Sequence, residues 1–154
     1  MISLIRVDDR LIHGQVMAVW VRLLSINRIL VADDEAAADA FSRQIMQLAM
    51  PSSTLLSVTP IDEAASQLPT IETDPSHTLV LLRTVAAAAQ LHLRYAYRTL
   101  NIGGIGMAPG RKPLWRSIAA SASEVEMLSQ LRRDGVDVYL QMIPSDVKKR
   151  IAGP

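Results

Sequence analysis

The sequence predicts an α/β fold: an open, mainly parallel β-sheet with helices on both faces, in a single domain over residues 1–154. Two observations predict this class. Apolar runs of strand length recur along the chain, and segments with helical spacing separate most of them. The segment 79–82 is also apolar at every position, which is typical of a central strand in a parallel sheet. The chain is long enough to bury one core without disulfides or metal ions.

The expected strands are six apolar segments, at residues 2–7, 28–32, 54–58, 78–82, 98–102 and 136–142. Residues 136–141 alternate between apolar and polar side chains, so this strand is expected near an edge of the sheet. Residues 67–77 contain Pro69 and Pro75 and are predicted to be the most loop-like stretch.

Helices are expected between the strands. Residues 16–24 are apolar except for Arg22 and predict a buried helix. Residues 35–50 predict an amphipathic helix that Pro51 ends, with an apolar face made of Ala37, Phe41, Ile45 and Leu48.

The last helix carries its own signals. Ser123 followed by Glu126 predicts a capping box at its start, and Gly135 closes the apolar stripe of Val125, Leu128 and Leu131. The basic run 148–150 is expected at the end of a terminal helix, where cations complement the helix dipole.

Composition excludes several classes of function. The chain has no cysteine, so it has no thiol catalysis, disulfides or cysteine metal sites, and it is compatible with a reducing cytoplasm. A net charge of +1 gives no electrostatic footprint for nucleic acid or an acidic membrane. No apolar stretch approaches the roughly 18 residues of a spanning helix. The beginning of the chain lacks the pattern of a signal peptide, so we expect no export.

The most informative segment is residues 6–16, which holds charge, histidine and glycine between an apolar strand and an apolar helix. Such a loop offers free N–H groups and a helix dipole to an anion, and His13 there can attack, shuttle a proton or carry a phosphoryl group. Asp8 and Asp9 lie between Arg6 and Arg10, which suggests an ion-pair network that holds the loop rigid.

Ligands of an open parallel sheet bind beyond the carboxyl ends of its strands. This rule brings residues 8–14, Asp33 with Asp34, Thr84 and residues 101–104 to one edge. His13 is the only histidine in the sequence that it places there. His77 and His92 are expected to be structural or solvated.

Two other segments at this edge leave alternatives open. Residues 101–112 contain four of the seven glycines, whose N–H groups can turn toward an anion, with Arg111 and Lys112 supplying charge. A flexible connection without a ligand is equally expected. Asp33 and Asp34 fit either a magnesium pair or the acidic start of a helix, and helix preferences favour capping.

Residues 8–16, with the sequence Asp-Asp-Arg-Leu-Ile-His-Gly-Gln-Val, resemble the phosphorylation-site segment of a known family. The family is the IIB proteins of the phosphoenolpyruvate-dependent sugar phosphotransferase system (PTS), mannose/fructose/sorbose class. The resemblance extends through Asp34-Glu35 and the alanine-rich helix after it, through residues 101–104 and 110–112, and through the closing strand and helix.

The resemblance implies that His13 is a phosphocarrier that uses Nδ1. Arg10 is expected to stabilise charge on the phosphoryl oxygens, since phosphoryl transfer depends mainly on positioning and electrostatics. Asp9 is expected to orient Arg10 or the imidazole. Gly14 and Gln15 offer N–H groups at the helix start.

The other consequences of the resemblance concern the pocket and the partners. Gly103 and Gly104 are expected to form a loop that closes the pocket, with Thr84 as a further candidate on its rim. The expected partners are a phosphorylated IIA protein, the IIC and IID membrane proteins and a sugar. We expect no nucleic acid, cofactor or metal ion, and a cytoplasmic protein associated peripherally with the permease.

Two other readings compete with a phosphocarrier. A regulatory module would hold a phosphorylated ligand at the same edge without becoming phosphorylated itself. A magnesium-dependent phosphoacceptor would instead use Asp33 or Asp34.

Overall fold

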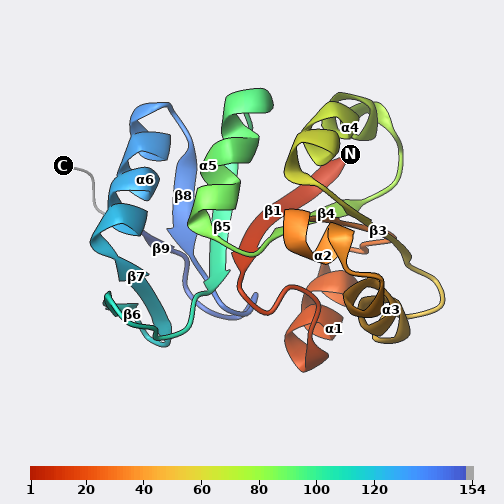
Figure 1. Cartoon of the computed structure of the whole chain (residues 1–154), viewed down its shortest axis with the longest axis horizontal. Helices are drawn as coiled ribbons and strands as arrows, with labels where there is room; N and C mark the ends of the chain where they lie inside the picture. Colours follow the sequence, from red (N-terminus) through yellow and green to blue (C-terminus); the bar gives the residue numbers. More distant parts are fainter. Residues whose placement is uncertain (152–154) are drawn as a thin grey trace.

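Strands and helices alternate along most of the chain in the computed structural model, which describes residues 1–151 except for the side chains of Gln15 and Val16 (Figure 1). The strands are β1 (Ile2–Asp8), β2 (Arg28–Ala32), β3 (Leu55–Thr59), β4 (Thr78–Leu82), β5 (Thr99–Gly104), β6 (Arg111–Trp115), β7 (Ile118–Ser121), β8 (Asp137–Leu140) and β9 (Lys149–Arg150). The helices are α1 (Gly14–Leu23), α2 (Asp34–Ala38), α3 (Ala40–Leu48), α4 (Ile61–Thr73), α5 (Val85–Arg94) and α6 (Ala122–Arg133).

The central sheet has the strand order β3-β2-β4-β1-β5-β8-β9 within residues 1–151. Neighbouring strands run parallel from β3 to β8, and the short β9 pairs antiparallel with β8. The prediction of an open, mainly parallel sheet is therefore confirmed. The fully buried β4 lies in the interior of the sheet, between β2 and β1, and β8 lies next to the edge strand, as expected.

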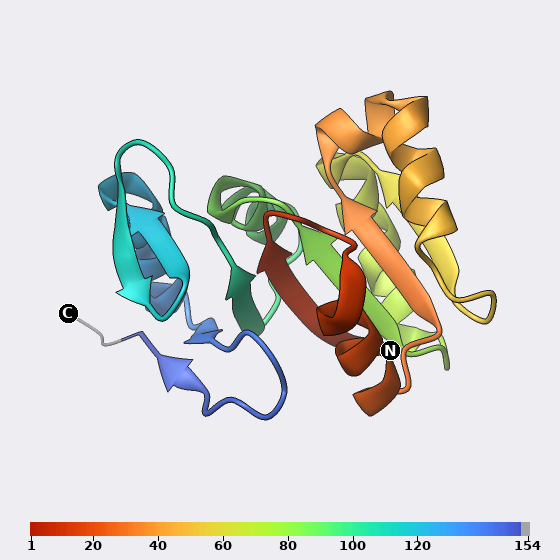
Figure 2. The same cartoon turned by 90° about the horizontal axis from the view of Figure 1, so that it is seen from below.

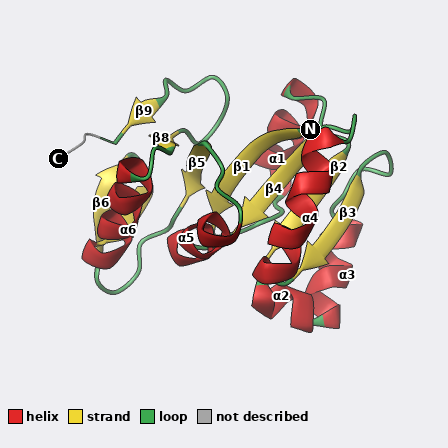
Figure 3. Cartoon of the chain, turned by 90° about the horizontal axis from the view of Figure 1, so that it is seen from above, coloured by secondary structure: helices red, strands yellow, loops and turns green. Residues whose placement is uncertain are grey.

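Helices cover both faces of the sheet, as predicted. One apolar cluster joins β2 and β4 to Met17 and Trp20 of α1, Ala36 of α2 and Met46 of α3. Figure 2 shows the backbone of these helices beside the sheet. The other cluster joins the sheet to α4, α5 and α6 (Figure 3). At about 25 cal/mol per Å² of buried apolar surface, these two layers provide the main stabilisation of the fold.

The predicted helix over 35–50 is wrong as one continuous element, because the chain breaks at Asp39 into α2 and α3. Asp39 adopts an extended conformation, and its carboxylate accepts hydrogen bonds from the Phe41 N–H and the Ser42 hydroxyl. This cap starts a new helix. In α3, all of whose residues are described, Met46 alone is buried, so the predicted apolar face of Phe41, Ile45 and Leu48 points to solvent.

The buried helix predicted over 16–24 is only partly correct. Met17 and Trp20 pack on the sheet, whereas Val19 and Leu23 are exposed. The loop predicted over 67–77 is also wrong for its first part, because α4 continues through Pro69 to Thr73. A proline inside a helix costs about 3 kcal/mol, and burial of apolar side chains on either side, Leu68 and Ile71, offsets this cost.

Two predictions near the end of the chain need correction, and one element there was not predicted. The capping box lies one half-turn earlier than expected, at Ser121 and Glu124, because β7 runs directly into α6. Residues 111–121 form the β6–β7 hairpin, an element that the sequence pattern did not indicate. The basic run ends in β9 rather than in a helix, where Arg150 pairs with Asp137.

Candidate functional site

The site begins with a buried ion pair at the carboxyl end of β1. Arg6 and Asp8 are two residues apart in the strand, and both are fully buried. Arg6 Nη2 lies 3.0 Å from Asp8 Oδ2, while Nη1 donates to Asn101 Oδ1 at 2.6 Å and to the Gln141 carbonyl at 3.0 Å. Burial lowers the pKa of the Arg6 guanidinium, and the Asp8 carboxylate opposes this shift. The ion pair therefore places a fixed carboxylate at the edge of the sheet.

Gly103 and Gly104 make room for this ion pair. A Cβ atom on Gly103 would lie 1.8 Å from Arg6 Cζ, and one on Gly104 would lie 2.9 Å from Asp8 Oδ1. Both glycines are buried within β5, so the prediction that they form a loop is wrong. Their missing side chains allow the charged groups of β1 to fit against the neighbouring strand.

The chain after β1 turns sharply and returns His13 to Asp8. Leu11 adopts a left-handed conformation with φ of 54°, and its N–H donates to the Asp8 carbonyl at 2.9 Å. A left-handed conformation costs a residue that carries a Cβ atom about 1–2 kcal/mol. Burial of the Leu11 side chain offsets this cost.

His13 is the N-cap residue of α1, and its side chain is 17% exposed. Its Nε2 atom lies 3.1 Å from Asp8 Oδ2. In the described part of the chain, Nδ1 takes part in no hydrogen bond. The imidazole is therefore held through one nitrogen, while the other is available to a ligand.

Arg10 contacts the second oxygen of the same carboxylate. Its backbone N–H lies 3.2 Å and its Nε 3.4 Å from Asp8 Oδ1, and its side chain is 52% exposed. Arg10 and His13, which the sequence analysis singled out, thus meet at Asp8. The Asp9 carboxylate accepts the Gly106 N–H at 2.7 Å, and its expected role in orienting Arg10 or the imidazole stays a prediction.

The remaining candidates at this edge have local partners. The Thr84 hydroxyl accepts the Ala87 N–H at 3.0 Å and caps α5. Asp33 caps α2 and pairs with Arg83 at 2.6 Å, and Asp34 accepts the Ile61 N–H at 2.9 Å. These contacts favour the capping role of Asp33 and Asp34 over a magnesium pair.

The glycine-rich segment 101–112 contributes less to the site than the anion-binding alternative suggested. The charge of Arg111 is paired with Glu124, at 2.8 Å, and Lys112 is exposed in β6. The Gly106 N–H is held by Asp9. This segment therefore connects β5 to the hairpin and is fastened to the His13 loop through Asp9.

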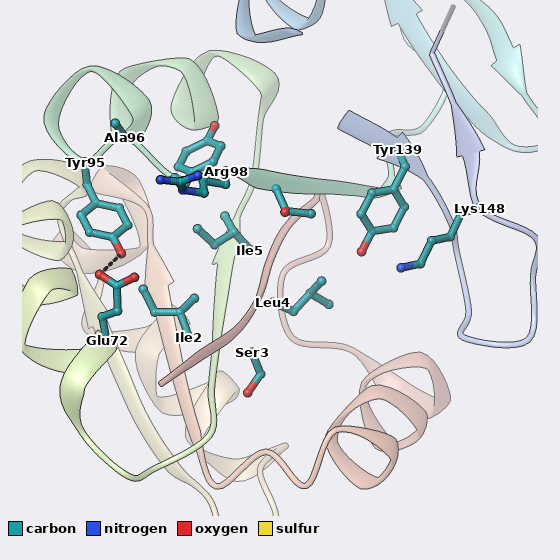
Figure 4. Close-up of a pocket in the computed structure, with 12 residues that line it drawn as sticks. Ile2, Ser3, Leu4, Ile5, Glu72, Tyr95, Ala96, Arg98, Tyr139 and Lys148 are labelled. Carbon is teal, nitrogen blue, oxygen red and sulfur yellow. Dashed lines mark hydrogen bonds between the residues drawn. The ribbon is translucent and has the colours of Figure 1, made fainter. Parts of the chain in front are cut away.

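Two cavities differ in their relation to His13. One, of about 450 Å³, lies at the opposite edge of the sheet, among residues that include Ile2, Tyr139 and Lys148 (Figure 4). A smaller one, of about 200 Å³, is lined by His13 and by residues of α1 and of the segment after α3.

None of the helices in residues 1–151 is long and apolar enough to cross a membrane.

The model of the family described as PTS system sorbose subfamily IIB component matches residues 2–153. The chain belongs to this family. PTS IIB components act as phosphotransferases in sugar transport, and this IIB component is accordingly assigned to that system. The sorbose-specific EIIB component of Klebsiella pneumoniae is 30% identical over 155 residues, which cover 94% of this chain and 89% of that relative.

Solved structures of relatives share the fold of this IIB component. The crystal structure of the IIBSor domain of the sorbose permease from Klebsiella pneumoniae superposes with a TM-score of 0.88 and 27% identity, covering 96% of this chain and 91% of that one. The crystal structure of manxB from Thermoanaerobacter tengcongensis has the same TM-score with 34% identity, covering 97% and 92%.

Sequence reasoning gave too small a role to Arg6 and Asp8 of this IIB component. It expected an ion-pair network, which the structure confirms for Asp8 with Arg6 and Arg10, but it assigned the orienting role to the neighbouring carboxylate. A signal was present in the strand itself. Side chains two residues apart share a face, so two opposite charges at this spacing in a buried strand indicate a pair.

Proposed function

We propose that this IIB component carries a phosphoryl group on Nδ1 of His13, accepting it from a phosphorylated IIA protein and passing it to a sugar. The contact between Asp8 and Nε2 of His13 carries the proposal. A carboxylate accepts hydrogen bonds, so the neutral imidazole keeps its proton on Nε2 and its lone pair on Nδ1. The nucleophilic nitrogen is then the one that the described residues leave open.

The transfer consists of two displacements. In the first, the Nδ1 lone pair forms a bond to the phosphorus of the donor phosphohistidine, and the donor N–P bond breaks with its electron pair returning to the donor nitrogen. In the second, a sugar hydroxyl oxygen bonds to phosphorus, the Nδ1–P bond breaks with its electron pair returning to Nδ1, and the hydroxyl proton passes to water. Phosphorylated His13 keeps its Nε2–H and carries positive ring charge, which the Asp8 carboxylate stabilises.

Arg10 supplies the cation for the phosphoryl oxygens. Its guanidinium contacts Asp8 only through Nε, at 3.4 Å, among the described residues, and half of the side chain faces solvent. The remaining N–H groups are free to meet the equatorial oxygens of the transferring group, where an arginine contributes strongly to phosphoryl transfer.

The start of α1 adds a weaker electrostatic contribution. Gly14 is the first residue of this helix and Gln15 the second, so their N–H groups lie at its positive end. The side chain of Gln15 lies outside the described residues. We give a structural role at this edge of the sheet to three further residues. Thr84 caps α5, and Gly103 and Gly104 leave room for Arg6 and Asp8.

Family membership supports the remaining partners. PTS IIB components work with IIA proteins, with the IIC and IID membrane components and with a sugar. We propose that this chain acts on the cytoplasmic side of such a permease, as a carrier between IIA and the membrane proteins. The edge of the sheet that carries His13 would then contact first the IIA donor and afterwards the membrane components with the sugar.

Intact-mass measurement tests the proposal. After incubation with phosphorylated IIA, the wild-type chain should gain one phosphoryl group that is labile in acid and stable in alkali, and His13→Ala should gain none. His77→Ala is the matched control, because His77 lies at the opposite end of its strand, before β4, and it should accept phosphate like the wild type. A stoichiometric phosphate on His13→Ala would refute the carrier role, and an unmodified wild type would support a regulatory binding module instead.

A further inference from the structure

Large apolar side chains are exposed on the helices that cover the His13 side of the sheet. On α3, Phe41, Ile45 and Leu48 point to solvent at positions that share one helix face. On α1, Val19 and Leu23 are exposed with the same four-residue spacing. Exposed apolar side chains that gather in this way are typical of an interaction surface.

The cavity of about 200 Å³ lies between α1 and the segment directly after α3, and we call it the apolar pocket. Its walls come from residues 12–14 and from Met17, Ala18 and Val21 of α1, with Ala49, Met50 and Pro51 opposite. Leu48, the last residue of α3, directly precedes this second wall. Apart from the His13 imidazole, the wall residues have apolar side chains or none.

The size and position of the apolar pocket suit one apolar side chain of a protein. Its volume is below the range of roughly 300–1,000 Å³ that small-molecule sites occupy. Because His13 forms part of the wall, any group that fills the pocket lies beside the reacting imidazole. A partner docked here also excludes water from the phosphoryl group, which suppresses hydrolysis during transfer.

We propose that the apolar pocket and the exposed face of α3 together form the docking surface for the phosphoryl donor protein, which inserts an apolar side chain beside His13. This inference rests on the proposed function, since it assumes that the donor approaches His13. Charge complementarity supports the donor as the occupant, because the half-exposed Arg10 on the adjoining loop faces the negative phosphoryl group that it brings. A second copy of this chain would bring two arginine-bearing loops together instead.

Leu48→Glu tests the surface, with Leu93→Glu as a matched control. Leu48 is 81% exposed at the end of α3 and Leu93 is 85% exposed on α5, which covers the other face of the sheet, so both variants should fold. Rapid-quench measurements of transfer from phosphorylated IIA should show the apparent KM for IIA raised about tenfold by Leu48→Glu, with kcat little changed. Leu93→Glu should behave like the wild type.

Binding of IIA, measured by calorimetry, separates this inference from the proposed function. Weaker binding to Leu48→Glu, and not to Leu93→Glu, supports the docking surface whether or not His13 gains phosphate. Equal affinity of both variants and the wild type overturns it. A wild-type dimer that Leu48→Glu dissociates, seen by sedimentation, also overturns it, because the surface then belongs to a second copy.

Discussion

At the residue scale, a single carboxylate connects the buried core to the reacting imidazole. One Asp8 oxygen contacts both Arg6 and His13, and the other contacts Arg10. Because Arg6 is also fixed by Asn101 and by the carbonyls of Gln141 and Met142, the position of Asp8 depends on β1, on β5 and on the segment after β8. The imidazole is thereby oriented by a fully buried and hydrogen-bonded ion pair.

The role of Arg10 gives a prediction at this scale. Arg10→Ala should slow phosphoryl transfer to His13 by about 10³-fold or more, because it removes the cation that meets the transferring oxygens. Its half-exposed side chain makes one long contact, so stability should change by less than about 0.5 kcal/mol. Rapid-quench kinetics and urea unfolding measure both effects.

Arg98→Ala is the control for this variant, since Arg98 is exposed and lines the cavity at the opposite edge of the sheet. It should transfer phosphate at the wild-type rate. Arg10→Ala with an unchanged transfer rate would show that another group stabilises the phosphoryl charge.

At the element scale, the ends of helices and strands depend on side-chain caps and strand pairing that the apolar pattern does not reveal. β2 and β4 were predicted residue for residue, because continuous apolar character identifies buried parallel strands. The break at Asp39 and the hairpin β6–β7 were missed, because a side-chain cap decides the first and the pairing of two short neighbouring strands decides the second. Apolar spacing alone also placed Phe41 and Leu48 in the core, although the surface that they form faces outward.

The start of α6 gives a prediction at this scale. Partial burial raises the pKa of Glu124, but hydrogen bonds from Arg111 and Ser121 outweigh it, so the net pKa lies below its ordinary value of 4.5. Glu124→Gln should lower the free energy of unfolding at neutral pH by about 1–2 kcal/mol, since it removes a charge-assisted hydrogen bond. Because the folded-state pKa is lowered, this contribution is full above pH 4.5 and is lost as the pH falls further.

Urea unfolding from neutral pH down to about pH 3 measures the difference between the two proteins. The exposed ion pair of Glu126 with Arg133 provides the control, and Glu126→Gln should cost less than about 0.5 kcal/mol. A Glu124→Gln penalty that stays constant across this range would contradict the role of the Glu124 charge.

At the scale of the whole molecule, sheet topology brings the site together. β1 lies between β4 and β5, so the loops after these strands share one edge. The rule for parallel sheets predicted this edge from sequence and placed His13 there without any coordinates. The rule does not predict which polar groups at this edge contact one another. Asp8 and Asp9 are adjacent in the sequence, but Asp8 contacts His13 and Asp9 contacts Gly106.

The two faces of the sheet also differ in how fully their apolar side chains are buried. The face covered by α4, α5 and α6 is the larger apolar core. The face covered by α1 and α3 leaves apolar side chains exposed and holds the apolar pocket beside His13. A carrier protein must bind its partners near the reacting group. We infer that apolar side chains on this second face stay exposed because partner proteins dock there.

The identity of the phosphorylated nitrogen tests the account most directly, because the contact of Asp8 with Nε2 makes Nδ1 the nucleophile. The measurement is ³¹P and long-range ¹H–¹⁵N NMR of the protein labelled with ¹⁵N in histidine and phosphorylated by IIA. We predict that phosphorus is bonded to Nδ1 of His13 and that Nε2 keeps its proton. Phosphorus on Nε2, or on any residue other than His13, would contradict the account.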